Sequence, residues 1–283
     1  DGARVGAQLL ADKRIRKISF TGSTEVGRTI MLGAADDLKR VSLELGGNAP
    51  FVVLGDADVE AAVAGALVAK FRNTGQSCVA ANRFIVEEPV AQAFTHRLCA
   101  EVGKLVVGRG SDPGIDIGPV IDDAAVAKIK RLVDDALGRG ARVLAGAPPS
   151  GTSRLVAPIV LGGITPEMAL WREEIFGPVV AIRVAHDEAE AIRLANDTEM
   201  GLVAYVYAQF GVRLPHSAAE QGGIGTKIAR SAAVPGDVVV MDGGSHVGIY
   251  IGGGRMIDAP EPGRVVSNDA IYDNDYYFVR FGI

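Results

Sequence analysis

The sequence is poor in cysteine, in aromatic residues and in net positive charge. It holds two cysteines, Cys78 and Cys99, and aromatic residues make up only 6% of its 283 positions. Two thiols cannot form the disulfide framework that stabilises small secreted modules. The cysteine content therefore favours a reducing compartment or a single reactive thiol.

Basic residues and long apolar runs are also scarce. The 29 lysines and arginines are outnumbered by 34 acidic residues, which gives a net charge of −5. A nucleic-acid or anionic-membrane partner requires a basic face, so neither partner is expected. No apolar run reaches the roughly eighteen residues of a membrane-spanning helix, and the first residues lack the basic-then-apolar pattern of a signal peptide. No metal site is assigned.

Apolar residues, by contrast, make up 48% of the chain, which is enough for one large domain or two ordinary ones. Helical and strand patterns alternate over about the first two hundred residues, and this alternation predicts an α/β fold with a mostly parallel sheet. Asp56 or Asp58 is the expected N-cap of the second helix. The expected strands cover residues 14–23, 40–47, 49–55, 83–88, 142–146 and 179–185, and the expected helices cover 24–35, 56–71, 89–105, 122–141 and 186–198.

The pattern changes near residue 205. Short strand patterns crowd together between turns such as "DGG" and "GGG", and they predict a small antiparallel sheet. The predicted domains are therefore residues 1–205 and residues 206–283. A helical pattern, "GLVAYVYAQFG", runs through this boundary. The expected strands of the second domain cover residues 236–241, 246–252, 255–260, 264–267 and 276–282.

Cys78 lies in "NTGQSCVAANRF", where Gly75 and small polar residues suit a tight turn that exposes the sulfur. A nucleophilic thiol needs access and a stabilised thiolate, which a helix N-terminus or nearby amides can supply. A buried structural cysteine fits the same pattern. The residues alone leave both interpretations open.

Glu44 stands between two leucines in "LELGGNAP". A carboxylate in apolar surroundings binds protons more readily than one in water, as a general base requires. An outward-facing glutamate on an alternating strand is the alternative, and the pattern alone favours it.

Gly22, Ser23 and Gly27 lie between an expected strand and an expected helix in "FTGSTEVG". Such a turn points backbone N–H groups at an anion, and the helix N-terminus adds positive potential. The spacing is not G-x-G-x-x-G, and strand-to-helix turns with two glycines are common, so the motif alone is a weak indication of a phosphate site.

Taken in order, five motifs resemble those of the aldehyde dehydrogenase superfamily, and their wording is most similar to its succinate-semialdehyde dehydrogenase branch. The motifs are "FTGSTEVG", "LELGGNAP", "FRNTGQSCVAANRF", "DIGPVI" and "REEIFGPVV". The resemblance covers about residues 1–207. It implies part of an α/β catalytic domain, NAD or NADP as the cofactor, a small aldehyde as the substrate and the cytoplasm as the compartment.

The same resemblance implies roles for single residues. Cys78 would attack the aldehyde to form a thiohemiacetal, and hydride transfer to the nicotinamide would leave a thioester. Glu44 would activate the water that hydrolyses this thioester.

The resemblance also implies a cofactor site. Gly22, Ser23 and Gly27 would face the pyrophosphate, while Glu174 and Phe176 would hold the ribose and the nicotinamide side. The family's upstream segment, with most of the dinucleotide-binding domain and an oxyanion-hole asparagine, has no counterpart in the printed sequence, nor have its C-terminal strands. Because losing one oxyanion donor costs about 10²–10³ in rate, impaired turnover is expected.

A histidine and an acid form a second constellation. "GSHVGIYIGGGRMIDAP" places His246 at the start of one strand and Asp258 near the end of the next, so the two could approach each other across a hairpin. An imidazole held by a carboxylate is the base-and-orienter part of a catalytic triad. A structural histidine at a strand edge is the alternative.

Residues 201–283 resemble the NlpC/P60 family of cell-wall cysteine peptidases, which have a papain-like α+β core. The resemblance is carried by "AQFGVRLPHSAAEQ", "AVPGDVVVM", "GSHVGIYIGGGRMIDAP" and "YYFVRFG". It implies that His246 is the general base, that Asp258 orients it, and that a peptidoglycan peptide is the partner, at the cell wall or outside the cell. Glu199 stands where this family has its nucleophilic cysteine.

Three hypotheses follow. The first is an NAD(P)-dependent aldehyde dehydrogenase with a peptidase remnant. The second is a peptidoglycan hydrolase, or a non-catalytic module that binds the cell wall. The third is a chimera, in the sense of an artificial or misassembled fusion without evolved function. The string "GLVAYVYA" suits a strand in one family and a helix in the other, and this conflict disfavours clean folding of the junction.

Overall fold

The computed structural model describes residues 2–198, 200, 226–234, 237–241, 246–258, 267–271 and 275–280. Within these ranges the strands form three sheets of two, five and six strands. The chain divides into two compact units, residues 1–47 and residues 48–283. The expected boundary near residue 205 stays a prediction.

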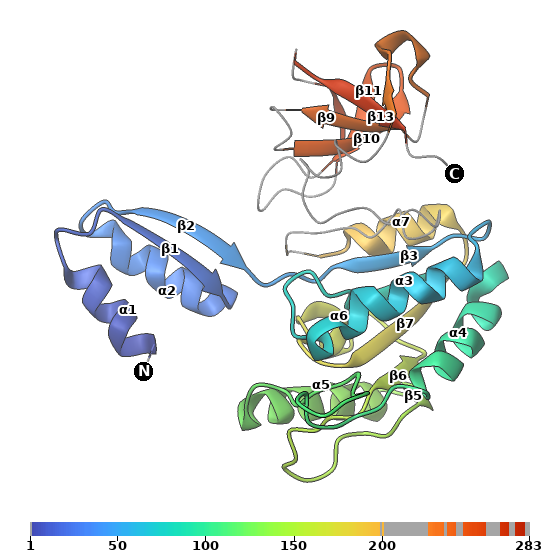
Figure 1. The fold of residues 1–283 in the computed structure, drawn as a ribbon, viewed down its shortest axis with the longest axis horizontal. Coiled ribbons are helices and arrows are strands. Elements are labelled where there is room, and N and C mark those ends of the chain that lie inside the picture. The colour runs from blue at the N-terminus through green and yellow to red at the C-terminus, as the bar shows by residue number, and fades with distance from the viewer. Residues whose placement is uncertain are drawn as a thin grey trace. The chain divides into compact units, whose positions relative to one another are not determined.

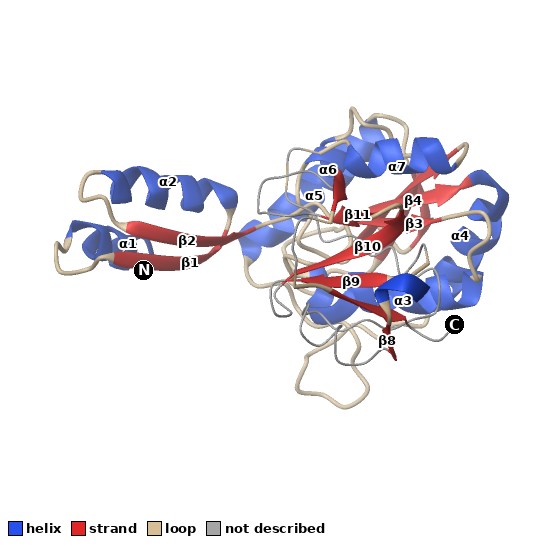
Figure 2. Ribbon diagram, turned by 90° about the horizontal axis from the view of Figure 1, so that it is seen from above, coloured by secondary structure: helices blue, strands red, loops and turns tan. Residues whose placement is uncertain are grey.

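The first unit is a βαβ element with one additional helix. Its elements are α1 (Gly2–Ala11), β1 (Lys17–Gly22), α2 (Thr24–Ala35) and β2 (Arg40–Leu45). β1 and β2 run parallel, as Figure 2 shows, with Lys17 opposite Arg40 and Gly22 opposite Leu45. The sequence patterns predicted β1, α2 and β2. They did not predict α1, which has no buried residue.

The five-stranded sheet confirms the mostly parallel α/β prediction. Its strands are β3 (Pro50–Val53), β4 (Arg83–Glu87), β5 (Arg142–Ala145), β6 (Ile159–Gly162) and β7 (Val179–Ala185). Their order is β3-β4-β7-β6-β5, and only β5 is antiparallel to its neighbour. β6 was not predicted.

Five helices lie around this sheet (Figure 1): α3 (Val59–Phe71), α4 (Glu88–Val102), α5 (Asp123–Gly138), α6 (Ala169–Arg172) and α7 (Glu188–Asn196). Successive strand residues serve opposite cores. Phe84 and Val86 pack with residues of α3 and α4, whereas Ile85 packs with residues of α5, α6 and α7. This period of two gives a three-layer arrangement with an apolar core on each face of the sheet.

The start of α3 distinguishes the two candidate caps. Asp58 is the N-cap, and its carboxylate accepts hydrogen bonds from the backbone N–H groups of Glu60 and Ala61 at 2.9 and 3.1 Å. Asp56 lies in the preceding turn. The Asp58 alternative is confirmed, because a cap must lie two to three residues before the amides that it satisfies.

The six-stranded sheet is antiparallel throughout, as predicted. Its strands are β8 (Thr226–Ile228), β9 (Val238–Met241), β10 (His246–Gly252), β11 (Arg255–Asp258), β12 (Ser267–Ala270) and β13 (Tyr277–Arg280), in the order β12-β11-β10-β9-β13-β8. β8 was not predicted, and β12 begins where the expected strand 264–267 ends. The shared string at residues 201–208 lies outside the described residues.

In the part of the chain that the structure describes, no helix combines the length and the apolar character that crossing a bilayer requires.

Candidate active site

Cys78 lies on a strained turn that follows α3, named here the thiol turn (residues 72–78). Asn73, Thr74 and Gly75 have φ values of 51°, 59° and 74°, so three successive residues adopt the left-handed region. For a β-branched residue such as Thr74 this conformation is an outlier, and such strain costs about 1–3 kcal/mol and gathers at functional sites. Cys78 is exposed, as the nucleophile interpretation requires.

The thiol turn packs directly against the "EEIFGP" motif. A Cβ added to Gly75 would lie 2.4 Å from the carbonyl oxygen of Gly177, so only glycine permits this approach of the two backbones. Gly177 is equally confined, because a Cβ there would lie 2.4 Å from Cδ1 of Ile129. Phe176, one residue earlier, has a φ of 54°. Two motifs far apart in sequence are therefore brought together, and the turn that carries Cys78 packs beside the segment of Glu174 and Phe176.

The "DIGPVI" motif completes the same region. The backbone N–H of Ile121 donates to Oε1 of Gln76 at 2.8 Å, and the hydroxyl of Thr74 donates to the carbonyl oxygen of Gly118 at 3.2 Å. These two contacts join the thiol turn to residues 118–121. Three of the five family-like motifs thus meet at the thiol turn.

Lys70, the penultimate residue of α3, was missed by the sequence analysis. Its side chain is completely buried, and its Nζ donates to Oδ1 of Asn82 at 3.2 Å. Burial lowers the pKa of Lys70 to about 7, while the nearby carboxylate of Glu174 opposes that shift. A lysine in the last turn of a helix usually indicates an exposed partner for the helix dipole, so its pattern gave no signal of burial.

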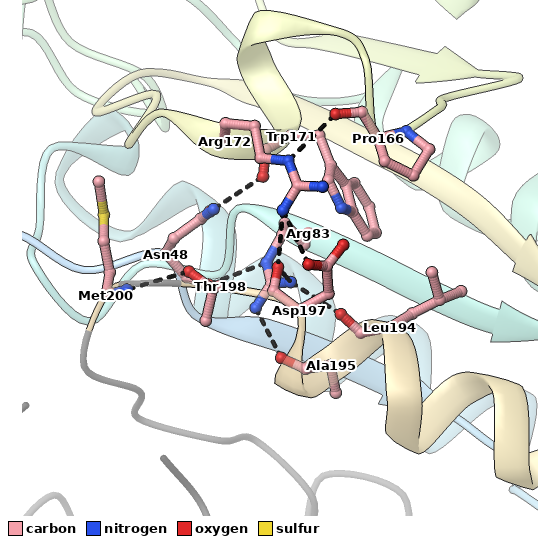
Figure 3. Close-up of polar contacts among 10 residues, drawn as sticks. All are labelled: Asn48, Arg83, Pro166, Trp171, Arg172, Leu194, Ala195, Asp197, Thr198 and Met200. Atoms are coloured by element: carbon pink, nitrogen blue, oxygen red, sulfur yellow. Dashed lines mark hydrogen bonds and ion pairs between the residues drawn. The ribbon is translucent and has the colours of Figure 1, made fainter. Parts of the chain in front are cut away.

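Arg83 forms a second buried cluster, drawn in Figure 3. It donates to the carbonyl oxygens of Asn48, Leu194 and Ala195 at 3.0, 2.9 and 2.8 Å, and its guanidinium lies 5.3 Å from the ring centroid of Trp171. Burial lowers the pKa of Arg83 to about 10. Because helix C-termini carry negative potential, the guanidinium is well placed to hold the end of α7 against the start of β4.

In the first unit, Ser23 caps α2. Its hydroxyl accepts from the backbone N–H of Val26 at 3.3 Å, and both Gly22 and Ser23 are exposed. Gly27 is buried, and a Cβ there would lie 2.6 Å from Cδ2 of Leu45. The open end of a twelve-residue helix fits an anionic group such as a pyrophosphate. Gly27 has a packing reason of its own, and the cofactor role of these residues stays a prediction.

Glu44 is exposed on β2, whereas Leu43 and Leu45 are half-buried. Because side chains alternate along a strand, its two leucine neighbours lie on the opposite face and do not enclose the carboxylate. Within its own unit, Glu44 therefore has the outward-facing placement that the sequence pattern alone favoured. Its role as the base stays a prediction, and Cys78 belongs to the other compact unit.

The second constellation lies on one hairpin, as predicted. β10 begins at His246 and β11 ends at Asp258, and the two strands pair with Ile249 opposite Ile257. The turn between them contains three glycines, Gly252 to Gly254, with φ values of 92°, 61° and 71°. The catalytic roles of His246 and Asp258 stay predictions, and Glu199 lies outside the described residues.

Comparison with known proteins decides the family. A sequence model of the aldehyde dehydrogenase family matches residues 1–241, well over half of the chain. The chain belongs to the aldehyde dehydrogenase family. The match extends past the predicted boundary near residue 205 and ends with β9.

Curated members of the aldehyde dehydrogenase family are similar over the same part of the chain. A glutarate-semialdehyde dehydrogenase of Pseudomonas aeruginosa is 46% identical over 206 residues, and a succinate-semialdehyde dehydrogenase [NADP(+)] of Escherichia coli is 48% identical over 206 residues. Each alignment covers 72% of this chain but 43% of the relative, so the chain spans less than half the length of these relatives.

Solved structures of aldehyde dehydrogenases are similar to this chain in fold as well as in sequence. The succinate-semialdehyde dehydrogenase from Burkholderia pseudomallei is 46% identical, with a TM-score of 0.70 over 72% of this chain and 42% of that one. The aldehyde dehydrogenase fold therefore covers about the first 72% of the chain.

Proposed function

We propose that the chain is the thiol-bearing part of an NAD(P)-dependent dehydrogenase that oxidises a semialdehyde to the acid. The observation that carries the proposal is that residues 118–121 and the segment of Glu174 and Phe176 both pack against the thiol turn, which carries the exposed Cys78. The substrate class is taken from the relatives, whose names specify succinate and glutarate semialdehydes.

In the proposed reaction, the thiolate of Cys78 attacks the carbonyl carbon of the aldehyde and forms a thiohemiacetal. A bound nicotinamide would supply the acceptor for the hydride that leaves this carbon. The resulting thioester remains on Cys78 until water attacks it, with Glu44 taking the proton from that water. Release of the acid returns the thiol to its starting state.

The cofactor would be NAD or NADP. We assign the pyrophosphate to the open start of α2 at Gly22, Ser23 and Gly27, because its amides and its dipole favour an anion. Glu174 and Phe176 would contact the ribose and the nicotinamide side. Two free cysteines suit the reducing cytoplasm as the place of this reaction.

A turnover assay on the full chain tests the proposal. Succinate or glutarate semialdehyde is supplied with NAD or NADP, and the absorbance of the reduced nicotinamide is followed. Cys78→Ala should abolish the signal. Cys99→Ala is the matched control and should retain it, because Cys99 is half-buried on α4 and burial raises the pKa of its thiol. Absence of turnover in the unaltered chain, or equal turnover in both variants, would contradict the proposal.

A second candidate function concerns the antiparallel sheet. We infer that the NlpC/P60-like segment docks a cell-wall peptide without cutting it, because His246 and Asp258 lie on paired strands while Glu199 occupies the nucleophile's place in the sequence. Purified peptidoglycan should retain the chain in a sedimentation assay. Retention no greater than that of an unrelated acidic protein would exclude this binding.

A further inference from the structure

Burial of a lysine side chain at position 70 costs free energy of folding. Its side chain is fully buried next to the apolar cluster that contains Ala69 and Phe71. An ammonium group there loses its hydration, and an apolar side chain of similar length would avoid that loss. Packing alone therefore does not explain a lysine at this place.

The contacts of Lys70 connect three segments of the candidate site. The residue lies just before the thiol turn, and a Cβ on Gly75 would lie 3.1 Å from the carbonyl oxygen of Lys70. Its Nζ donates to Asn82, four residues after Cys78, and its charge is attracted by Glu174 of the "EEIFGP" motif. Lys70 is thus connected to both ends of the chain segment that holds the thiol and to the segment packed against it.

We propose that Lys70 is a positioning residue, whose ammonium ties Asn82 and the carboxylate of Glu174 to the thiol turn and whose deprotonation changes the reactivity of Cys78. The proposal rests on the proposed function in one respect, the role of Cys78 as nucleophile. Lys70 itself does not touch the reacting atoms.

The surroundings of Lys70 place its deprotonation near neutral pH. Burial lowers the pKa of Lys70 to about 7, and Glu174 is the charged group that acts on it among the described residues. Asn82 contributes a neutral acceptor. Below pH 7 the ammonium is present and attracts the carboxylate of Glu174. Above pH 7 the neutral amine no longer attracts that carboxylate.

The test is the rate of alkylation of Cys78 by iodoacetamide in the full chain, resolved by peptide mass spectrometry between about pH 5.5 and 9. We expect two inflections, the second of which lies near pH 7 and changes the rate about twofold or more. Lys70→Met should remove the second inflection. Lys130→Met, at an exposed position on α5, is the matched control and should keep it.

Glu174→Gln provides the second measurement, which holds even if Lys70→Met does not fold. Without the carboxylate, the charged form of Lys70 loses its stabilising partner, so the second inflection should move to lower pH. A single inflection in the unaltered chain, or no movement in Glu174→Gln, would overturn the proposal. Turnover measured on the same samples distinguishes the two proposals. Two inflections without turnover would support the positioning role of Lys70 and contradict the dehydrogenase activity. Turnover with a single inflection would support the dehydrogenase activity and contradict the role of Lys70.

Discussion

At the residue scale, a few positions with unusual surroundings define the candidate site. Gly75 permits a close approach to the backbone of Gly177 that a Cβ would prevent, and Asn73 and Thr74 accept left-handed conformations beside it. Lys70 adds a buried charge. Each of these features costs free energy, and their gathering around one exposed thiol is typical of a functional site.

Gly75→Ala should destabilise the chain by about 3 kcal/mol, because an L side chain at positive φ costs about 1 kcal/mol and the backbone of Gly177 blocks the new Cβ. Gly114→Ala is the matched control. Its φ of 75° is nearly that of Gly75, at 74°, but open space surrounds it, so only about 1 kcal/mol should be lost. Urea unfolding measures both values, and equal losses would show that the contact with Gly177 does not matter.

The stability of the chain should rise with pH above about 7 through Lys70. Its folded pKa, about 7, lies below the ordinary lysine value of 10.5, so between these values the unfolded chain binds more protons. The free energy of unfolding should therefore increase by up to about 1.4 kcal/mol per pH unit across this window. Urea unfolding at several pH values should show this slope in the unaltered chain and in Lys130→Met. If Lys70→Met retained the full slope, the titration would belong to another group.

At the scale of the element, side chains at the ends of helices fix where the helices begin and how they are held. Asp58 caps α3, Asp122 caps α5 and Asp187 caps α7, each by accepting a backbone N–H of the first turn. Arg83 acts at the other end of α7, where it binds the last carbonyl oxygens. The first kind of contact is local in sequence, and the second is not.

Asp58→Ala should cost about 1 kcal/mol of stability, because two amides of α3 lose their acceptor. Asp56→Ala is the matched control two residues earlier and should change the free energy of unfolding by less than about 0.5 kcal/mol. Urea denaturation distinguishes the two. A larger loss in Asp56→Ala would mean that the helix begins elsewhere.

Arg83→Met should cost about 3 kcal/mol, since two buried carbonyl oxygens and one part-buried carbonyl oxygen lose their donor and the cation over Trp171 is removed. Arg154→Met removes an exposed ion pair with Asp123 and should cost no more than about 0.5 kcal/mol. Hydrogen exchange at residues 194–198 should accelerate only in Arg83→Met. Unchanged exchange there would mean that the guanidinium does not hold α7.

At the scale of the whole molecule, the cores of the three sheets differ greatly. The five-stranded sheet has an apolar core on each face, whereas the buried apolar residues of the first unit are Ile30 and Ala34, among the residues that the structure describes. A two-stranded sheet with so little buried apolar area gains little stability from its own packing.

Amide hydrogen exchange should therefore be fastest in β1, α2 and β2 and slowest in β4 and β7, which are central strands of the five-stranded sheet. The expected difference in opening free energy is several kcal/mol, on the order of the global stability of a small domain. Mass spectrometry of exchanged peptides measures it in the unaltered chain. Equal protection of residues 17–45 and residues 83–87 would show that the first unit gains its stability from elsewhere.

Local patterns in the sequence determined most of the elements. The short apolar runs of β4 and β7, the helical spacing of α5 and the acidic caps each act over a few residues, so they could be recognised without a structure. The order of five motifs also indicated the family. α1, which has no buried residue, and β6, a strand of four residues, were not predicted.

Only the tertiary structure decided which distant residues meet. Gly75 contacts Gly177 because the parallel pairing of β4 with β7 brings together the segments that precede these strands. Arg83, at the start of β4, binds carbonyl oxygens of Leu194 and Ala195 near the end of α7. The burial of Lys70 has the same origin, since its environment is built by residues from other elements. A linear pattern reports how a segment is built, and the surroundings of a side chain depend on the segments that fold against it.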